Sequence, residues 1–469
     1  MKPPIWMIAL LLLSLISCST ETDKPVKKNN SDNHPLTTIK IIADGPNSVT
    51  AFKLEEEEIA KKFGVKLVFH YPDRITENVE DFLFTARDEK YDIFVLYSEK
   101  LPLYVEQNMI LPLDNYINEE TTSDILPIYK NMYMKYNHHD YGMIYDGGAH
   151  LLFYREDLFK KYNEEYKKMY GVDLAAPKTW EEHDRIAKFL TRDTNGDGKY
   201  DIYGTAFLND VGMRYIWYLN RFLSKGGSYF DEDMTPLIDS DIGIEALREM
   251  VHLSNSKAVP PGATYDWTDL NSAFLQGNVA MVVQWSDTAR FSYDKKTWDS
   301  KVAGKVGWTL VPGDGKTHPQ GGTWLARVLA ISKETDNPDK VWEVIQYITS
   351  KEISNRAIKS YDAGNDPYRQ SHFIVNEKGP FSSIEENKSL LNTLEKSLEN
   401  TNADLIMPGC REYMQSLDNN IGLALIGNLS PEEALEKTAK EWEQITDQYG
   451  RENQKQHYKA WLNKVEKIK

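Results

Sequence analysis

TIKIIADGPNSVTAFKLEEEEIAKKFGVKLVFHY, residues 38–71, is the stretch that decides the fold. Its first part, residues 38–42, is an apolar run rich in β-branched side chains and is predicted to form a strand. Asp44-Gly45-Pro46-Asn47 has the composition of a turn, and a helix is expected over residues 49–63. Residues 65–71 are again apolar and predict a second strand.

The following residues repeat this order of elements. Gly64 suits the position just after a helix, a second helix is expected over 77–87, and YDIFVL at 91–96 predicts a third strand. Strands that alternate with helices pair in parallel, which indicates an α/β lobe. Ligands of such open sheets lie beyond the carboxyl ends of the strands, and Asp44 and Tyr97 stand at two such ends.

A two-glycine break separates the next pair of strands. Residues 141–145 and 150–154 have strand-like patterns, and Asp146-Gly147-Gly148-Ala149 lies between them. Glycine accepts backbone rotation at little cost, so this break is predicted to act as a hinge. Further on, Thr179 and Ser430 each precede a glutamate by three residues, which predicts two capped helix starts.

The first 18 residues have the pattern of an export signal. A positive Lys2 precedes the apolar run 5–16, which is shorter than the roughly 20 residues that a membrane span needs. Residues 15–18 resemble the lipobox of bacterial lipoproteins. We therefore expect residues 1–17 to be a lipoprotein signal peptide, Cys18 to carry a lipid, and the polar residues 18–36 to form a disordered tether. The alternative is a plain signal peptide with an incidental cysteine.

Composition excludes some partners. The 469 residues carry a formal net charge of −16, which argues against nucleic acid as a general partner. The chain has 2 cysteines, so with Cys18 acylated Cys410 has no partner and no internal disulfide is expected. We expect a monomer.

Five segments, taken together and in order, resemble the maltodextrin-type family of bacterial extracellular solute-binding proteins, family 1. Their positions are DGGAHLLFYREDLFKKY (146–162), PKTWEEHDRIAKFL (177–190), AFLQGNVAMVVQWSD (273–287), GGTWLARVLAISKETDNPDKVWEVIQYITSKE (321–352) and IMPGCREYMQSL (406–417). The resemblance spans nearly the whole mature chain.

The resemblance implies an α/β, two-lobe periplasmic-binding-protein-like fold of the class II type, with hinge crossovers and a ligand cleft between the lobes. The first lobe would comprise residues 37–146 and 305–365. The second would comprise residues 151–303 and 375–469, and the stretch 361–373 would lie near the later crossover.

The function implied by the resemblance is that of an extracytoplasmic lipoprotein of an ABC importer. Such a protein binds a carbohydrate, here expected to be an oligosaccharide, delivers it to the permease subunits, and is not an enzyme. Such a protein lies outside the cytoplasm, in the periplasm or on the outer face of the cell membrane, and its lipid holds it to the membrane. Two alternatives stay open, a secreted glycoside hydrolase and a lipoprotein scaffold that is not part of a transporter.

Aromatic residues are the first group of candidate ligand contacts. Sugars present apolar ring faces edged by hydroxyls, so their sites combine flat side chains with planar polar groups. The candidates are Tyr97, Trp217, Trp285, Trp324 and Tyr413. By resemblance, Trp285 and Tyr413 occupy places where the family has stacking rings, while the ring of Trp324 follows three small residues that leave it open. For each ring, packing in the core or on the surface is the alternative.

Three aspartates are the polar candidates for bonding sugar hydroxyls. They are Asp44, Asp146 and Asp362. Asp44 follows the first strand, whereas Asp146 and Asp362 lie beside the expected hinge segments. For the last two, a turn cap is the alternative.

Residues 193–201 fit the front of a calcium-binding loop. The expected ligands are the side chains of Asp193, Asn195, Asp197 and Asp201 and the main chain of Lys199. Ca²⁺ takes oxygen ligands at this spacing, and Gly198 supports the sharp turn. Gly204 stands where an EF-hand has its bidentate glutamate, so the alternative is a polar turn without an ion.

Overall fold

The computed structural model describes residues 36–71, 89–315, 325–400 and 402–466. The predicted signal peptide, the tether with Cys18, the helix over 77–87 and Trp324 lie outside these residues. Residues from Leu36 onward form one compact unit.

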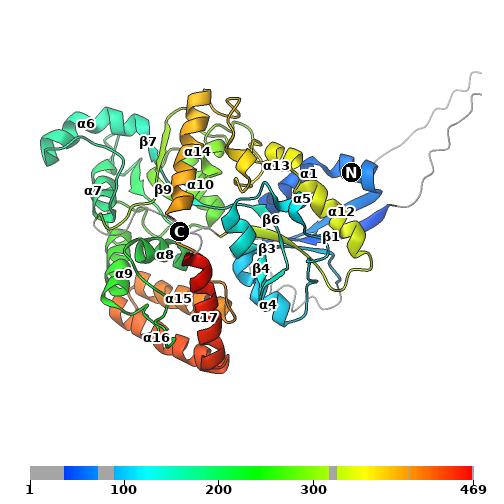
Figure 1. Cartoon of the computed structure of the whole chain (residues 1–469). Helices are drawn as coiled ribbons and strands as arrows, with labels where there is room; N and C mark the ends of the chain where they lie inside the picture. The colour runs from blue at the N-terminus through cyan, green and yellow to red at the C-terminus, as the bar shows by residue number, and fades with distance from the viewer. Residues whose placement is uncertain (1–35, 72–88, 316–324, 401, 467–469) are drawn as a thin grey trace, which may run out of the picture. The chain divides into compact units, whose positions relative to one another are not determined.

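The first of two main sheets has the strand order β2-β1-β3-β11-β6 (Figure 1). Its strands are β1 (Thr37–Ile42), β2 (Val65–His70), β3 (Ile93–Tyr97), β6 (Met143–Asp146) and β11 (Arg327–Ile331). β1 pairs with β2 and β3 in parallel, as the alternating pattern predicts. β11 runs antiparallel to both β3 and β6, so its first residue lies beside their last residues.

The second sheet has the strand order β10-β7-β9-β8. Its strands are β7 (His150–Arg155), β8 (Tyr203–Thr205), β9 (Val279–Trp285) and β10 (Val306–Thr309). All seven residues of β9 are buried. The range 305–365 was expected in the first lobe. β10 instead belongs to the second sheet, where it pairs with β7 and Val306 lies opposite Arg155. A small hairpin pairs β4 (Lys135–Tyr136) with β5 (His139–Asp140).

The segment between β6 and β7 joins the two sheets and touches a second crossing near residue 366. Gly147 donates its N–H to the Asp366 carbonyl at 3.1 Å, and Asn365 Nδ2 donates to the Tyr145 carbonyl at 3.1 Å. A Cβ on Gly147 would lie 2.1 Å from the Pro367 carbonyl oxygen, so this close approach of two backbones requires glycine.

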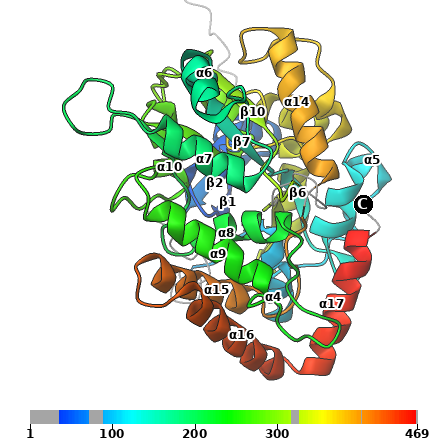
Figure 2. The ribbon, with the colours of Figure 1, turned by 90° about the vertical axis from the view of Figure 1, so that its left-hand side faces the viewer.

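Helices cover both sheets. Those of the first part of the chain are α1 (Thr50–Leu54), α2 (Glu56–Phe63), α4 (Leu101–Glu106), α5 (Glu119–Thr122), α6 (Glu156–Tyr170) and α7 (Trp180–Leu190). Those in the middle are α8 (Arg214–Ser224), α9 (Asp241–Ser254), α10 (Trp267–Leu275), α11 (Thr288–Phe291), α12 (Pro338–Ile348) and α13 (Lys351–Ala357). The last are α14 (Ile384–Glu399), α15 (Cys410–Leu425), α16 (Pro431–Gln448) and α17 (Arg451–Glu466). α8, α9, α15 and α16 pack against one another (Figure 2).

Local sequence explains several of these boundaries. Thr179 and Glu182 exchange side-chain and backbone hydrogen bonds at the start of α7, and Ser430 and Glu433 do the same at α16. Gly64 ends α2 with a φ of 65°, a conformation that glycine adopts without a steric penalty. The helix predicted over 49–63 is divided at Glu55, whose carboxylate accepts hydrogen bonds from Arg356.

Candidate functional site

Four polar side chains meet at one edge of the first sheet. β3 and β6 end at Tyr97 and Asp146, and the antiparallel β11 begins between them at Arg327. The register pairs Arg327 with Tyr97 on one side and with Asp146 on the other. Asp44 follows β1 at the same edge, as expected for the carboxyl ends of neighbouring parallel strands.

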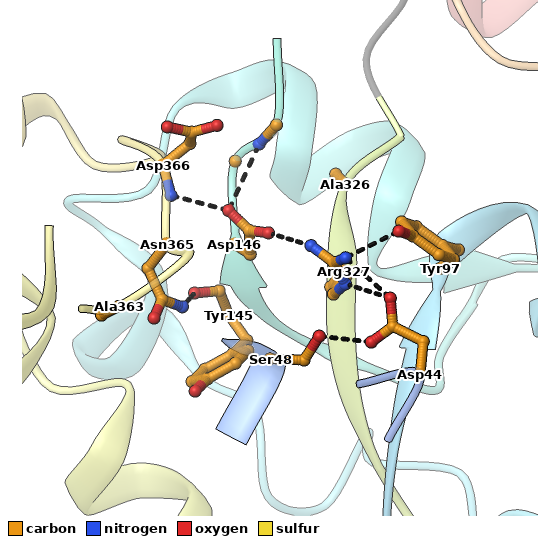
Figure 3. Close-up of polar contacts among 12 residues, drawn as sticks. Asp44, Ser48, Tyr97, Tyr145, Asp146, Ala326, Arg327, Ala363, Asn365 and Asp366 are labelled. Atoms are coloured by element: carbon orange, nitrogen blue, oxygen red, sulfur yellow. Dashed lines mark hydrogen bonds and ion pairs between the residues drawn. The ribbon is translucent and has the colours of Figure 1, made fainter. Parts of the chain in front are cut away.

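Arg327 holds this group together (Figure 3). Its Nη2 donates to Asp44 Oδ2 at 2.7 Å and to the Tyr97 hydroxyl at 2.6 Å. Its Nη1 donates to Asp146 Oδ2 at 2.7 Å, and its Nε donates to Asp44 at 3.1 Å. The Ser48 hydroxyl donates to the other oxygen of Asp44. The guanidinium also lies 4.4 Å from the centre of the Tyr97 ring, a cation–π contact.

The charges of this group depend on one another. Burial would lower the pKa of Arg327, but the nearby carboxylates raise it well above its usual range. Burial would likewise raise the pKa of Asp44, and the facing guanidinium of Arg327 outweighs this and lowers it. For Asp146 burial prevails, and its pKa is raised. A buried arginine with more than one carboxylate partner therefore stays charged at neutral pH.

Residues from the second sheet and the later crossing face this edge. Trp285 is the last residue of β9, and Asp287 lies two residues further along the chain, after Ser286. Asp366, in the later crossing, donates its backbone N–H to Asp146 Oδ1 at 2.7 Å (Figure 3). The Ser286 hydroxyl donates to Asp366 Oδ1 at 2.5 Å, so the end of β9 is tied to that crossing.

These groups line a cavity of about 310 Å³. Its walls come from the turn after β1, the ends of β3, β6 and β9, the start of α10 and the later crossing. The lining residues are Gly45, Pro46, Asn47, Ser48, Tyr97, Asp146, Met213, Asp266, Trp267, Thr268, Asp269, Trp285, Asp287, Arg327, Gly364 and Asp366. Both main sheets contribute, and the size is within the range of small-molecule sites.

Two indole rings belong to the cavity wall. The Trp285 ring meets the His150 ring edge-on, with centroids 4.3 Å apart. Trp267 is the first residue of α10, which Asp266 caps by accepting the backbone N–H of Asp269 at 2.8 Å. The Trp267 ring is supported by edge contacts with Phe291 and Trp298. Rings fixed in this way can present a flat apolar face at low entropic cost.

The acidic groups of the cavity outnumber its arginines. Burial raises the pKa of Asp287 to about 7, with Arg290 acting against the shift and Asp146 adding to it. Burial and the neighbouring Asp287 raise the pKa of Asp366 well above its usual range. Carboxyl groups so placed accept hydrogen bonds from a solute's hydroxyl or ammonium groups.

Four of the eight predicted ligand contacts meet at this site, and three of those that the structure describes do not. Tyr97, Asp146 and Trp285 line the cavity, and Asp44 bonds the arginine of its wall. Trp217 instead stacks on Phe207 in the core. Tyr413 is fully buried against Trp442 and Phe230.

Asp362 and Trp324 are the remaining two predicted contacts. Asp362 is an exposed residue that accepts a hydrogen bond from Thr297 Oγ1 at 2.8 Å, outside the lining of the cavity. Trp324 lies outside the described residues.

Sequence reasoning missed Arg327, Asp287 and Asp366. A signal existed for Arg327, which is the one charged residue in the otherwise apolar run 325–331. Asp287 lies two residues after Trp285, as Asp44 lies two residues after the predicted strand over 38–42.

The predicted calcium loop folds into a series of polar turns. Asp193 accepts the N–H groups of Gly196 and Gly198 at 2.7 and 2.8 Å. Asp201 accepts the Thr194 N–H and hydroxyl, each at 2.6 Å. Throughout the described ranges, no three acidic, histidine or cysteine side chains lie close enough to hold a metal ion. Calcium binding by this loop stays a prediction.

A two-sheet α/β unit with a polar, ring-lined cavity is the architecture of a solute-binding protein. The family described as bacterial extracellular solute-binding protein matches residues 57–354. The chain belongs to this family, as the sequence resemblance indicated.

Solved structures of similar fold include several with bound solutes. An ABC transporter solute-binding protein of Agrobacterium radiobacter K84 in complex with ribitol has a TM-score of 0.74 at 22% identity, covering 88% of this chain and 100% of that one. A maltose-bound T. maritima protein has a TM-score of 0.72 at 21% identity, covering 87% of this chain and 100% of that one. These likenesses confirm the predicted two-lobe periplasmic-binding-protein fold.

Two curated relatives match smaller shares of this chain than these solved structures do. A Sinorhizobium fredii protein named "probable amino-acid ABC transporter periplasmic-binding protein" is 27% identical over 154 residues, which are 32% of this chain and 33% of that protein. A binding protein of Brucella abortus is 21% identical over 349 residues, 74% of this chain and 78% of that protein.

Every helix within the described residues is too short or too polar to span a bilayer.

Proposed function

We propose that this protein is the solute-binding component of an ABC importer and that it captures a sugar or polyol in the cavity beside Arg327. The solute would be held by groups from both main sheets and from the later crossing. Support comes from the family and from similar folds that hold ribitol and maltose.

One observation carries the proposal. The same cavity combines the Arg327 network on the first sheet with the Trp285 ring at the end of the second. Planar polar groups bond hydroxyls in fixed directions, and an indole covers the apolar C–H face of the same solute. A chain-like polyol or a pyranose ring offers both kinds of surface.

Delivery to a permease and attachment to the membrane belong to the same proposal. We propose that Cys18 carries the lipid and that the monomer reaches the permease on its tether. Replacing Cys18 by serine is expected to move the protein from the membrane fraction to the soluble fraction of cells without changing its solute affinity. A membrane-bound Cys18→Ser protein would contradict the anchor.

The solute is expected to leave the cavity chemically unchanged. A glycoside hydrolase uses two carboxyl groups about 5–9.5 Å apart on either side of the scissile bond. Asp146 of this cavity and Asp44 beside it both bond Arg327, which favours a holding role. Recovery of an oligosaccharide intact after long incubation, judged by its NMR spectrum, is the expected result, whereas cleavage would favour the hydrolase.

Isothermal titration against a panel of ribitol, mannitol, glucose, maltose and maltotriose tests the proposal most simply. At least one member is expected to bind with one site per chain. A variant in which Trp285 is alanine should bind the same member more weakly. A folded protein that binds none of the panel would contradict the proposed sugar or polyol function.

An amino acid is the second candidate solute, because the Sinorhizobium fredii relative is named for one. An α-amino acid brings a carboxylate, which binding sites hold with a free arginine fork. Four of the N–H groups of Arg327 already donate to Asp44, Asp146 and Tyr97. A sugar or polyol is therefore preferred, and a panel of amino acids in the same titration separates the two candidates.

A further inference from the structure

The cavity and the network beside it hold more carboxyl groups than guanidinium groups. Four buried carboxyl groups gather around the end of β6 and the later crossing, and two guanidinium groups face them. The carboxyl groups belong to Asp44, Asp146, Asp287 and Asp366. The guanidinium groups belong to Arg290 and Arg327. Asp266 and Asp269 add two more carboxyl groups at the start of α10.

Neither arginine neutralises Asp287 by direct contact. Arg327 is occupied by Asp44 and Asp146. Arg290 directs Nη2 to the carbonyl oxygens of Ala363 and Asn365 at 2.9 and 2.8 Å, and Nη1 lies 3.8 Å from Asp366. The guanidinium groups thus serve to hold the crossing and the sheet edge together.

Asp287 has an oxygen atom without a hydrogen-bond partner. The residue lines the cavity and is 3% exposed, and its Oδ1, which is closed off from solvent, has no donor among the described residues. A buried carboxylate oxygen without a donor is unfavourable, because it has lost water and gained nothing in return. An ammonium that approached this carboxyl group from the cavity would supply the positive charge that neither arginine brings into contact with it.

We propose that the solute is a sugar or polyol that carries an ammonium group, and that this ammonium lies against Asp287. The inference rests on the proposed function and names its substrate class more narrowly. An ammonium brings three donors and a positive charge into a cavity with an excess of carboxylates, whereas a hydroxyl brings one donor and no charge. The remaining hydroxyls of such a solute have Asp146, Asp366 and Asp266 as acceptors.

The pH dependence of binding follows from the same groups. Asp146, Asp366, Arg290 and Arg327 face Asp287, and its pKa of about 7 reflects burial first and the charges second. Below this pKa the carboxyl is neutral and a cation gains little from it. Affinity for an ammonium-bearing solute is therefore expected to rise from pH 5.5 to pH 8 and to be accompanied by proton release.

The test compares solutes that differ by one group. Isothermal titration at pH 7.5 pairs ribitol with 1-amino-1-deoxyribitol, mannitol with 1-amino-1-deoxymannitol, and glucose with glucosamine. In at least one pair the amine is expected to bind about tenfold more tightly, which is the scale of one charge-assisted contact. The preference should fall to less than about threefold in Asp287→Asn and persist in Asp362→Asn, whose carboxyl lies outside the cavity.

Each outcome decides between the two proposals. Equal or tighter binding of the hydroxyl member in the wild-type protein would overturn the ammonium inference and leave the sugar or polyol function standing. An amine preference that survives in Asp287→Asn would overturn the assignment to Asp287. No binding of any member by the folded protein would overturn both. The wild-type comparison needs no variant, so it decides even where Asp287→Asn does not fold.

Discussion

Arg327 illustrates how one residue sets the electrostatics of its surroundings. It is the shared partner of Asp44 and Asp146, both of which are buried. Arg327→Met would leave both carboxyl groups without a cation, and removing one partner of a buried ion pair costs about 3–5 kcal/mol. Urea unfolding should show a loss of this size, while Lys340→Met, which breaks an exposed pair with Glu343, should cost under about 1 kcal/mol. Equal small losses would contradict the role of Arg327.

Asp287 is expected to make the stability of the protein depend on pH. Its pKa in the folded protein is about 7, above the ordinary value of 3.8, so between these values the folded state holds a proton that the unfolded state releases. Stability of the solute-free protein should therefore fall as pH rises from 4 to 7, by at most about 1.4 kcal/mol per pH unit from this group. Urea unfolding at several pH values measures the slope. Asp287→Asn should reduce it, and an unchanged slope would show that other groups cause it.

Trp285 is the aromatic residue on which solute affinity is expected to depend most. Trp285→Ala removes a ring that lines the cavity and should weaken solute binding by about 1–3 kcal/mol, the scale of a buried aromatic contact. Trp308→Ala is the matched control, because Trp308 packs against Phe381 away from the cavity. Titration of both variants decides the point, and unchanged affinity in Trp285→Ala would remove this ring from the site.

At the scale of single elements, the crossing between β6 and β7 is the most constrained. Gly147→Ala would place a methyl group against the Pro367 carbonyl and should cost about 1–3 kcal/mol through overpacking. Gly364→Ala meets atoms only at ordinary contact distance, so it should be neutral or stabilise by up to about 1 kcal/mol. Thermal unfolding of both variants measures the difference. A neutral Gly147→Ala would mean that the two crossings separate readily.

The loop over residues 193–201 is predicted to bind calcium. If it binds calcium, millimolar calcium should raise the melting temperature of the wild-type protein relative to chelator, and Asp193→Ala should lose that gain. Asp336→Ala, at an exposed position elsewhere, serves as the control. A wild-type protein that melts at the same temperature in calcium and in chelator would contradict the prediction.

Elements defined by neighbouring residues were predictable, and those defined by distant ones were not. The caps at Thr179 and Ser430 depend on residues three positions away, so the pattern suffices. At the break after α1, Glu55 bonds Arg356, some 300 positions away, and no local pattern contains this contact. β10 joined the second sheet through pairing with β7, which is equally non-local.

For the whole molecule, the α/β class and the two-lobe fold followed from the alternation of elements and the family resemblance. Asp44 and Tyr97 were predicted because the end of a strand has a defined place in a sheet, and Trp285 was predicted from the family resemblance. Trp217 and Tyr413 were placed wrongly at the cavity, because an aromatic residue has the same sequence signature in a core as in a site. Arg327 needs the register of three strands, which sequence alone does not contain.

A crystal structure of the protein with whichever solute binds most tightly in the titrations would test the central claim most directly. We expect electron density for the solute between Arg327 and Trp285, with hydrogen bonds to residues of the first sheet and of the later crossing and ring contact from β9. Density for the solute elsewhere on the molecule, or contacts from one sheet alone, would contradict binding in this cavity.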